Sequence, residues 1–213
     1  MEIVTGPVLY FRGMEAGHCR IGALVVLPKN HRPALLYPGV GEPVSARQLG
    51  RGPGLTAWGY DFQLPAGQPG HYTIGARSWS VHPPGGGPLR IAYTACNGSE
   101  RDRPGPVAPE RNERWRHLAR QHEHTPYQLL IQGGDQVYAD ALWKEVSQLH
   151  RWCRLSWRRQ LQADFTPAMA REVGDFYFRH YCWLWSQPDL APLLASIPSL
   201  MMWDDHDIFD GWG

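Results

Sequence analysis

The 213-residue sequence lacks the features that mark exported and membrane proteins. No apolar run approaches the roughly 18 residues that a membrane span requires. The first residues carry neither a basic stretch followed by an apolar one nor a twin arginine. Only four cysteines are present, without a CxxC pair, which excludes a disulfide framework in a chain of this size. We therefore expect a protein of the reducing cytoplasm that does not bind membranes.

A large net charge is also lacking. The chain has 21 basic and 20 acidic residues, so its overall charge does not favour a nucleic acid as a partner. Four arginines at helical spacing (151, 154, 158 and 159) are interpreted as a solvated helix face rather than a phosphate-binding surface. Hydrophobic residues make up 43% of the chain, which excludes a disordered, coiled-coil or collagen-like protein.

The chain changes character near residue 84. Before it, the apolar stretches at 23–27, 57–64 and 72–81 are short, lie between glycine and proline turns, and partly alternate with polar residues. This pattern predicts an antiparallel β-sandwich over residues 1–84. Proline and glycine then cluster over 83–88, where neither a helix nor a central strand could continue, and predict a linker.

From residue 89 onward, strands and helices alternate. The pattern predicts strands at 89–94, 127–132 and 200–203, and helices from about 109, over 142–153 and over 167–187. Thr166 and Pro167 supply an N-cap and a first-turn proline for the longest helix. This order is typical of a parallel sheet, so the predicted fold class is α/β, with a second domain over residues 89–213.

Polar side chains follow all three of these predicted strands. Cys96 and Asn97 follow the first, residues 133–140 follow the second, and residues 203–213 follow the third. Because the loops after parallel strands meet at one edge of the sheet, we expect these side chains to lie together in a crevice. So many carboxylates would repel one another without a cation. The sequence therefore predicts a metal site.

The ligand types narrow the choice of metal. A thiolate of Cys96 and a phenolate of Tyr138 require a strong Lewis acid to keep both deprotonated at neutral pH, and ferric iron fits best. Asp135 follows two glycines, which allow backbone and ion to approach closely, and is a natural bridge between two metals.

The third strand end supplies a second set of candidates. Asp205 is expected to bind a harder ion such as Ca²⁺, Mg²⁺ or Mn²⁺. His206 then points at whatever the metals bind, and either Asp207 or Asp204 is expected to fix its tautomer.

Each of these residues also has a structural interpretation. A single cysteine such as Cys96 is more often a buried structural thiol, Gly-Gly-Asp after a strand is often a turn with a helix cap, and Tyr138 fits a core position. The run from Asp204 to Asp207 is different, because three acids and an imidazole directly after an apolar strand have no evident structural purpose. Together the three strand ends favour the metal site.

Two motifs, Gly134 to Asp140 and Asp204 to Asp207 with the trailing residues 210–213, resemble the PhoD-like alkaline phosphatase family of metallophosphoesterases. The strand-end Cys96 resembles that family's first metal ligand. The resemblance covers about residues 89–213 and implies the first half of a metallophosphoesterase-like α/β sandwich. It also implies that Cys96, Asp135 and Tyr138 bind Fe³⁺, that Asp135 bridges to Ca²⁺, that Asp205 rather than Asp204 binds the second ion, and that His206 is the catalytic acid.

The resemblance implies a phosphoric ester hydrolase, either a phosphatase or a phosphodiesterase, whose partner is a phosphate ester substrate. The alternative is a non-catalytic or truncated family member that acts as a binding module. Two features depart from the family: the twin-arginine export signal is missing, and the sequence stops directly after the third motif, without counterparts of the family's later ligands. We therefore expect the 213-residue chain alone to be a poor catalyst or none.

Overall fold

The computed structural model describes residues 2–98, 102–106 and 109–212, so that Gly213 of the third motif lies outside the described residues. The first part of the chain is all β, as predicted. Its strands are β1 (Thr5–Glu15), β2 (His18–Pro28), β3 (Leu36–Pro38), β4 (Arg47–Gly52), β5 (Leu55–Pro65), β6 (Gly70–Ile74) and β7 (Arg77–Val81). The apolar stretch at 72–81 therefore contains a hairpin turn rather than one strand, and β1 had no counterpart among the predicted stretches.

The second part alternates strands and helices, which confirms the α/β class. Its elements are β8 (Ile91–Thr94), the 3-10 turn η1 (Pro109–Asn112), α1 (Glu113–His124), β9 (Leu129–Gly133), α2 (Leu142–Glu145), α3 (Ser147–Cys153), α4 (Trp157–Gln162), α5 (Pro167–Trp185), α6 (Ala191–Ser196), β10 (Ser199–Met202) and the 3-10 turn η2 (Asp205–Asp207). Helix α5 begins as expected, because the Thr166 hydroxyl accepts a hydrogen bond from the Met169 amide at 3.1 Å.

The helix predicted over 142–153 is wrong in one respect. The chain forms two short helices there, because Val146 between α2 and α3 is extended (φ −81°, ψ 106°). The carboxylate of Glu172 on α5 accepts a hydrogen bond from the Gln148 amide at 3.2 Å and so stabilises the new helix start. A contact from a distant helix thus supports the start of α3.

The strands form two sheets that share one buried core in the first part of the chain. A three-stranded sheet has the order β3-β6-β7, and a seven-stranded sheet has the order β4-β5-β2-β1-β10-β9-β8. Tyr72 of the small sheet packs on Phe62 of the large one, with ring centroids 5.2 Å apart. This core contains side chains of both sheets, including Ile21, Tyr60 and Ile74.

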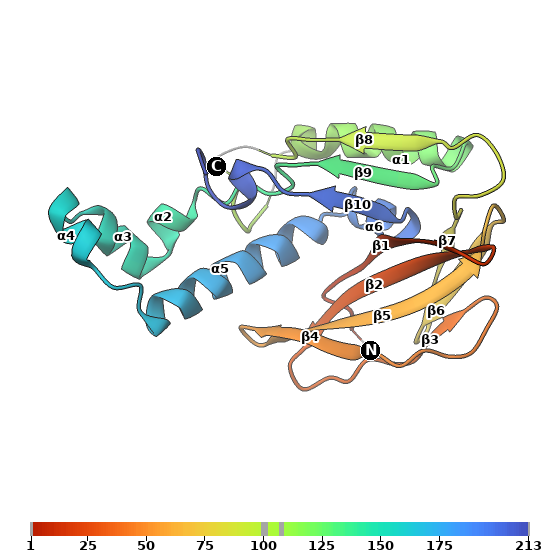
Figure 1. Ribbon diagram of the computed structural model, residues 1–213, viewed down its shortest axis with the longest axis horizontal. Coiled ribbons are helices and arrows are strands. Elements are labelled where there is room, and N and C mark those ends of the chain that lie inside the picture. The colour runs from red at the N-terminus through yellow and green to blue at the C-terminus, as the bar shows by residue number, and fades with distance from the viewer. Residues whose placement is uncertain (1, 99–101, 107–108, 213) are drawn as a thin grey trace.

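The large sheet runs across the predicted domain boundary (Figure 1). Strand β1 pairs with β10 in parallel, with Tyr10 opposite Ser199, and so joins the antiparallel strands to the parallel group β10, β9 and β8. The boundary between residues 84 and 89 stays a prediction, but hydrogen-bonded strands connect the two sides.

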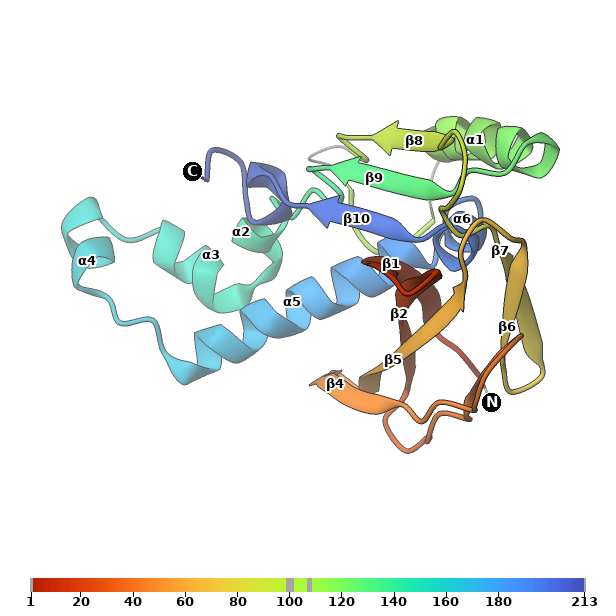
Figure 2. The same ribbon diagram turned by 45° about the vertical axis from the view of Figure 1, so that its right-hand side comes forward.

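The two faces of the parallel group differ. One face is covered by helices: Trp115 of α1, Leu184 of α5 and Leu193 of α6 pack with the strand residues Ala92 and Leu130. The opposite face exposes the side chains of Ile91, Tyr93, Leu200 and Met202. Helices α3 and α4 project away from the sheets (Figure 2). Among the described helices, none is both long and apolar enough to cross a membrane.

Candidate metal centre

The loops after β8 and β9 touch each other at the carboxyl edge of the sheet. The Cys96 amide donates to the Gly134 carbonyl at 3.1 Å. The Cys96 thiol donates to Asp135 Oδ2 at 3.4 Å. Both Cys96 and Asp135 have left-handed backbones, with φ of 55° and 50°. Cys96 is exposed, so its interpretation as a buried structural thiol is wrong.

Gly134 allows the third loop to join the other two. Its φ is 112°, and a Cβ added to it would lie 2.7 Å from the Cβ of Asp204. The absence of a side chain at Gly134 thus leaves room for the loop after β10, while the approach of an ion that the two glycines predict stays a prediction. The acids of two strand ends therefore meet.

Three carboxylates gather where these loops meet. Asp135, Asp204 and Asp205 each place one oxygen within 4.8 Å of the others, and Asp205, His206 and Asp210 form a second such group. Asp135 is only 7% exposed, and its Oδ1 has no hydrogen-bond partner among the described residues. An uncompensated buried carboxylate oxygen is costly unless a cation or a water binds it. The donor set therefore fits a metal ion.

His206 lies beside Tyr138 and is oriented by Asp140. The two rings stack with centroids 4.2 Å apart and planes 27° apart. His206 Nδ1 lies 2.8 Å from Asp140 Oδ2, and Asp140 Oδ1 accepts a hydrogen bond from the Asp210 amide at 2.7 Å. The expectation that Asp207 or Asp204 fixes the tautomer of His206 is therefore wrong. The position of Asp140 within its motif did not indicate that it orients His206. The contact arises because the loop after β9 lies against the loop after β10.

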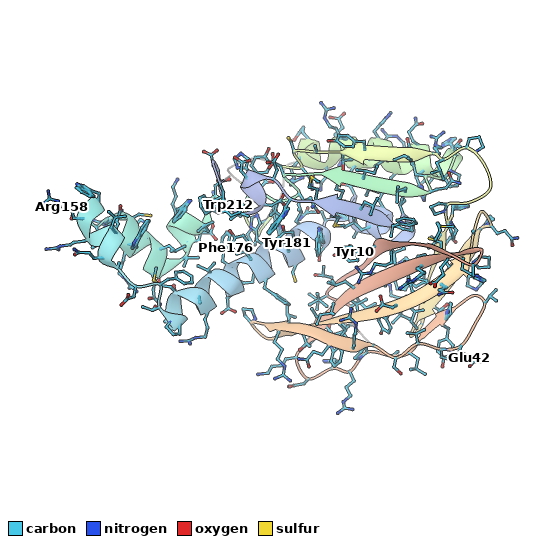
Figure 3. All side chains as sticks on the ribbon, viewed as in Figure 1. Tyr10, Glu42, Arg158, Phe176, Tyr181 and Trp212 are labelled. Atoms are coloured by element: carbon cyan, nitrogen blue, oxygen red, sulfur yellow. The ribbon has the colours of Figure 1, made fainter. Side chains whose placement is uncertain are left out.

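Asp207 has a structural role that the sequence did not indicate. It is 4% exposed, and its Oδ1 accepts hydrogen bonds from the amides of Gln136 at 3.0 Å and Val137 at 3.1 Å. Its Oδ2 accepts from the Asp204 amide at 3.0 Å, and Tyr181 of α5, labelled in Figure 3, donates to Oδ1 at 3.3 Å. Asp207 thus ties the second and third loops to each other.

The acids also change the pKa values of neighbouring groups. The hydrogen bond to Asp135 raises the pKa of the Cys96 thiol, and burial and the Asp135 charge raise it further. Burial, followed by the charges of Asp135 and Cys96, raises the pKa of Tyr138 to about 12. The Gly211 amide, which donates to Asp205, lowers the pKa of that carboxyl. The protein alone therefore keeps the thiol and the phenol protonated, and only a bound cation would favour their anions.

The structure brings all five predicted site residues to one edge of the sheet. Cys96 contacts Asp135, Tyr138 stacks on His206, and Asp205 shares the acidic group with Asp135. Asp204 belongs to the same group as Asp205. It also caps η2, because its side chain accepts a hydrogen bond from the Asp205 amide at 3.0 Å.

Comparisons with known proteins found a family model that matches the second part of the chain and two proteins that are similar to the chain. A family model described as "PhoD related phosphatase" matches residues 93–213. The chain is 28% identical over 114 residues to "Uncharacterized protein YGR266W" of Saccharomyces cerevisiae, a match that covers 46% of this chain and 16% of the relative. It is also similar to the solved "Structure of PhoD", with 14% identity and a TM-score of 0.48, over 98% of this chain and 39% of the other. The chain spans less than half the length of either protein.

Proposed function

Because the chain belongs to the family of PhoD related phosphatases, as its motifs predict, we propose that it is a metal-dependent hydrolase of phosphoric esters, a phosphatase or a phosphodiesterase. The observation that carries this proposal is the buried Oδ1 of Asp135, which has no partner among the described residues and lies in a group of three carboxylates. A site of this charge has a strong requirement for a cation.

We assign the ligands by their chemistry. Cys96, Asp135 and Tyr138 would hold the first ion, Fe³⁺, because a thiol and a phenol with raised pKa values lose their protons when they bind a metal ion, and most readily when that ion is a strong Lewis acid. Asp135 and Asp205 would hold the second ion, Ca²⁺ or else Mg²⁺ or Mn²⁺. When bound, such ions activate water and stabilise charge that develops on phosphoryl oxygens.

His206 would deliver a proton to the leaving oxygen. A carboxylate only accepts hydrogen bonds, so its contact with Asp140 keeps a proton on Nδ1 of His206, and the proton that His206 would deliver is the one that the imidazolium carries on Nε2. Burial lowers the pKa of His206, but the hydrogen bond and charge of Asp140, together with the charges of Asp135 and Asp205, outweigh it and raise the pKa overall. The stacked ring of Tyr138 fixes the plane of the imidazole.

The test is metal content together with turnover. The purified protein is loaded with iron and calcium, and its metal content and its hydrolysis of p-nitrophenyl phosphate and bis(p-nitrophenyl) phosphate are measured. We expect Asp135→Asn to lose most of the metal, whereas Asp164→Asn, an exposed acid between α4 and α5, retains it. A wild-type protein that binds no metal contradicts the proposal. Turnover that depends on the bound metal supports the hydrolase rather than the binding module.

We also propose a cytoplasmic location with a phosphate ester as the partner. All four cysteines are free thiols in the structure, as suits a reducing compartment. Cell fractionation, with alkylation of the thiols before lysis, tests this assignment. Recovery of the protein outside the cytoplasm with oxidised cysteines would contradict it.

A further inference from the structure

Asn97, which follows Cys96, uses every polar group it has. Its amide donates to the Asp135 carbonyl at 2.7 Å, and its side-chain Nδ2 donates to the Gln136 carbonyl at 3.2 Å. Its Oδ1 accepts from Trp115 Nε1 at 2.7 Å and from Arg111 Nη1 at 3.2 Å. Its carbonyl accepts from Arg111 Nη2 at 2.8 Å. One residue therefore connects the loop after β8, the loop after β9 and the start of α1.

The anchors of Asn97 are themselves held by an ion pair and by burial. Arg111 forms an ion pair with Asp102 at 2.6 Å, and both side chains are 13% exposed. Trp115 is buried in the main core, with an exposure of 5%. Asn97 therefore connects the start of the packed helix α1 to the loops after β8 and β9.

Cys96 needs such support. Its side chain is exposed, so packing does not fix it, and its left-handed backbone is one that a non-glycine residue adopts only when its surroundings impose it. The same holds for the backbone of Asp135. The two bonds from Asn97 to the carbonyls of Asp135 and Gln136 join these strained loops side by side.

We propose that Asn97 is a positioning residue that holds the Cys96 thiol at the Asp135 carboxylate and so makes the sulfur available as a metal ligand. This inference rests on the proposed metal centre. A purely structural role would change stability and leave the bond between sulfur and metal intact. Second-layer residues of this kind typically change metal affinity by about 10-fold to 100-fold.

Cobalt(II) is a suitable probe, because a thiolate bound to it gives a charge-transfer band in the near ultraviolet. The wild-type protein and the variants are titrated with Co²⁺, and the band and the dissociation constant are measured. Cys96→Ser shows that the band arises from this sulfur. We expect Asn97→Ala to lose most of the band and to bind Co²⁺ at least about 10-fold more weakly.

Asn112→Ala is the matched control. Asn112 is a buried asparagine that also contacts Arg111, at 3.2 Å, but its other bond runs to Gln187, just after the end of α5. This variant should lose stability and keep the band. If Asn97→Ala does not fold, Asn97→Asp decides, because it keeps the acceptor for Trp115 and Arg111 and replaces the donor to Gln136 with a charged oxygen that repels this carbonyl.

The outcomes separate the two proposals. A wild-type protein without a Cys96-dependent band contradicts the ligand assignment and, with it, the role of Asn97. A wild-type band that persists at full strength in the folded Asn97 variants overturns the role of Asn97 alone. Equal loss of the band in Asn112→Ala would also overturn it, because the effect would then follow general destabilisation.

Discussion

Replacing Asp207 tests the view that this acid is structural. Its two oxygens accept hydrogen bonds from three backbone amides, those of Gln136, Val137 and Asp204, and from the Tyr181 hydroxyl. Burial raises the pKa of the Asp207 carboxyl, although these donors lower it. The cost of removing Asp207 therefore arises mainly from the amides that lose their acceptor.

The magnitude follows from those three amides. A buried donor left without a partner costs about 1–3 kcal/mol, and water entering the vacated space recovers part of it. We expect Asp207→Ala to lower the free energy of unfolding by about 3 kcal/mol. Asp207→Asn keeps one oxygen acceptor but directs its NH₂ group at the Asp204 amide, or at the other two after a flip. It should cost about 1–2 kcal/mol.

Urea denaturation followed by circular dichroism measures these differences. The exposed Asp164→Ala is the control and should stay within about 0.5 kcal/mol of the wild type. The m-value should be unchanged, since the same surface is exposed on unfolding. If Asp207→Ala costs less than about 1 kcal/mol, the three amides are satisfied in another way and the structural assignment fails.

Three further predictions concern other parts of the chain. In the iron-loaded protein, Tyr138→Phe should weaken or shift a visible charge-transfer band; a colourless protein with full iron occupancy would contradict the ligands. Gly134→Ala should cost about 1–3 kcal/mol in thermal unfolding, because its φ is 112°, whereas Gly174→Ala, with open space at its Cβ, should not destabilise. Hydrogen bonds from the side chain and amide of Gln148 lower the pKa of Glu172 from its ordinary value, so its stabilising contribution should disappear as the pH falls through that lowered pKa. Glu172→Gln should flatten that part of the melting-temperature profile, and an unchanged profile would refute the interaction.

The local signals in the sequence located the strands of the second part well. The three apolar runs that were predicted as strands became β8, β9 and β10, and Thr166 began α5 as a cap. These features depend on neighbours in sequence, which is why the pattern contains them. The break at Val146 depends instead on Glu172 and could not be found in this way.

Sheet continuity was the main feature that the sequence concealed. Strand β1 begins at Thr5 and contains glycine and proline near its start, which obscured its alternation. Its pairing with β10 joins Tyr10 to Ser199, residues at opposite ends of the chain. Parallel strands are not joined by a tight turn, so no turn motif in the sequence indicates that β1 and β10 pair. The composition of residues 83–88 predicted a linker between two domains. The seven-stranded sheet, however, contains hydrogen-bonded strands from both sides of these residues.

The acids at the three strand ends illustrate a second limit. The spacing of these acids in the sequence does not distinguish one from another, but their hydrogen bonds do. Both oxygens of Asp207 are occupied by amides, and both oxygens of Asp140 are occupied by His206 and the Asp210 amide. Asp135 keeps a buried oxygen without a partner among the described residues. Because a carboxylate whose oxygens already accept hydrogen bonds has less capacity left for a cation, these contacts favour Asp135 as the centre of the site.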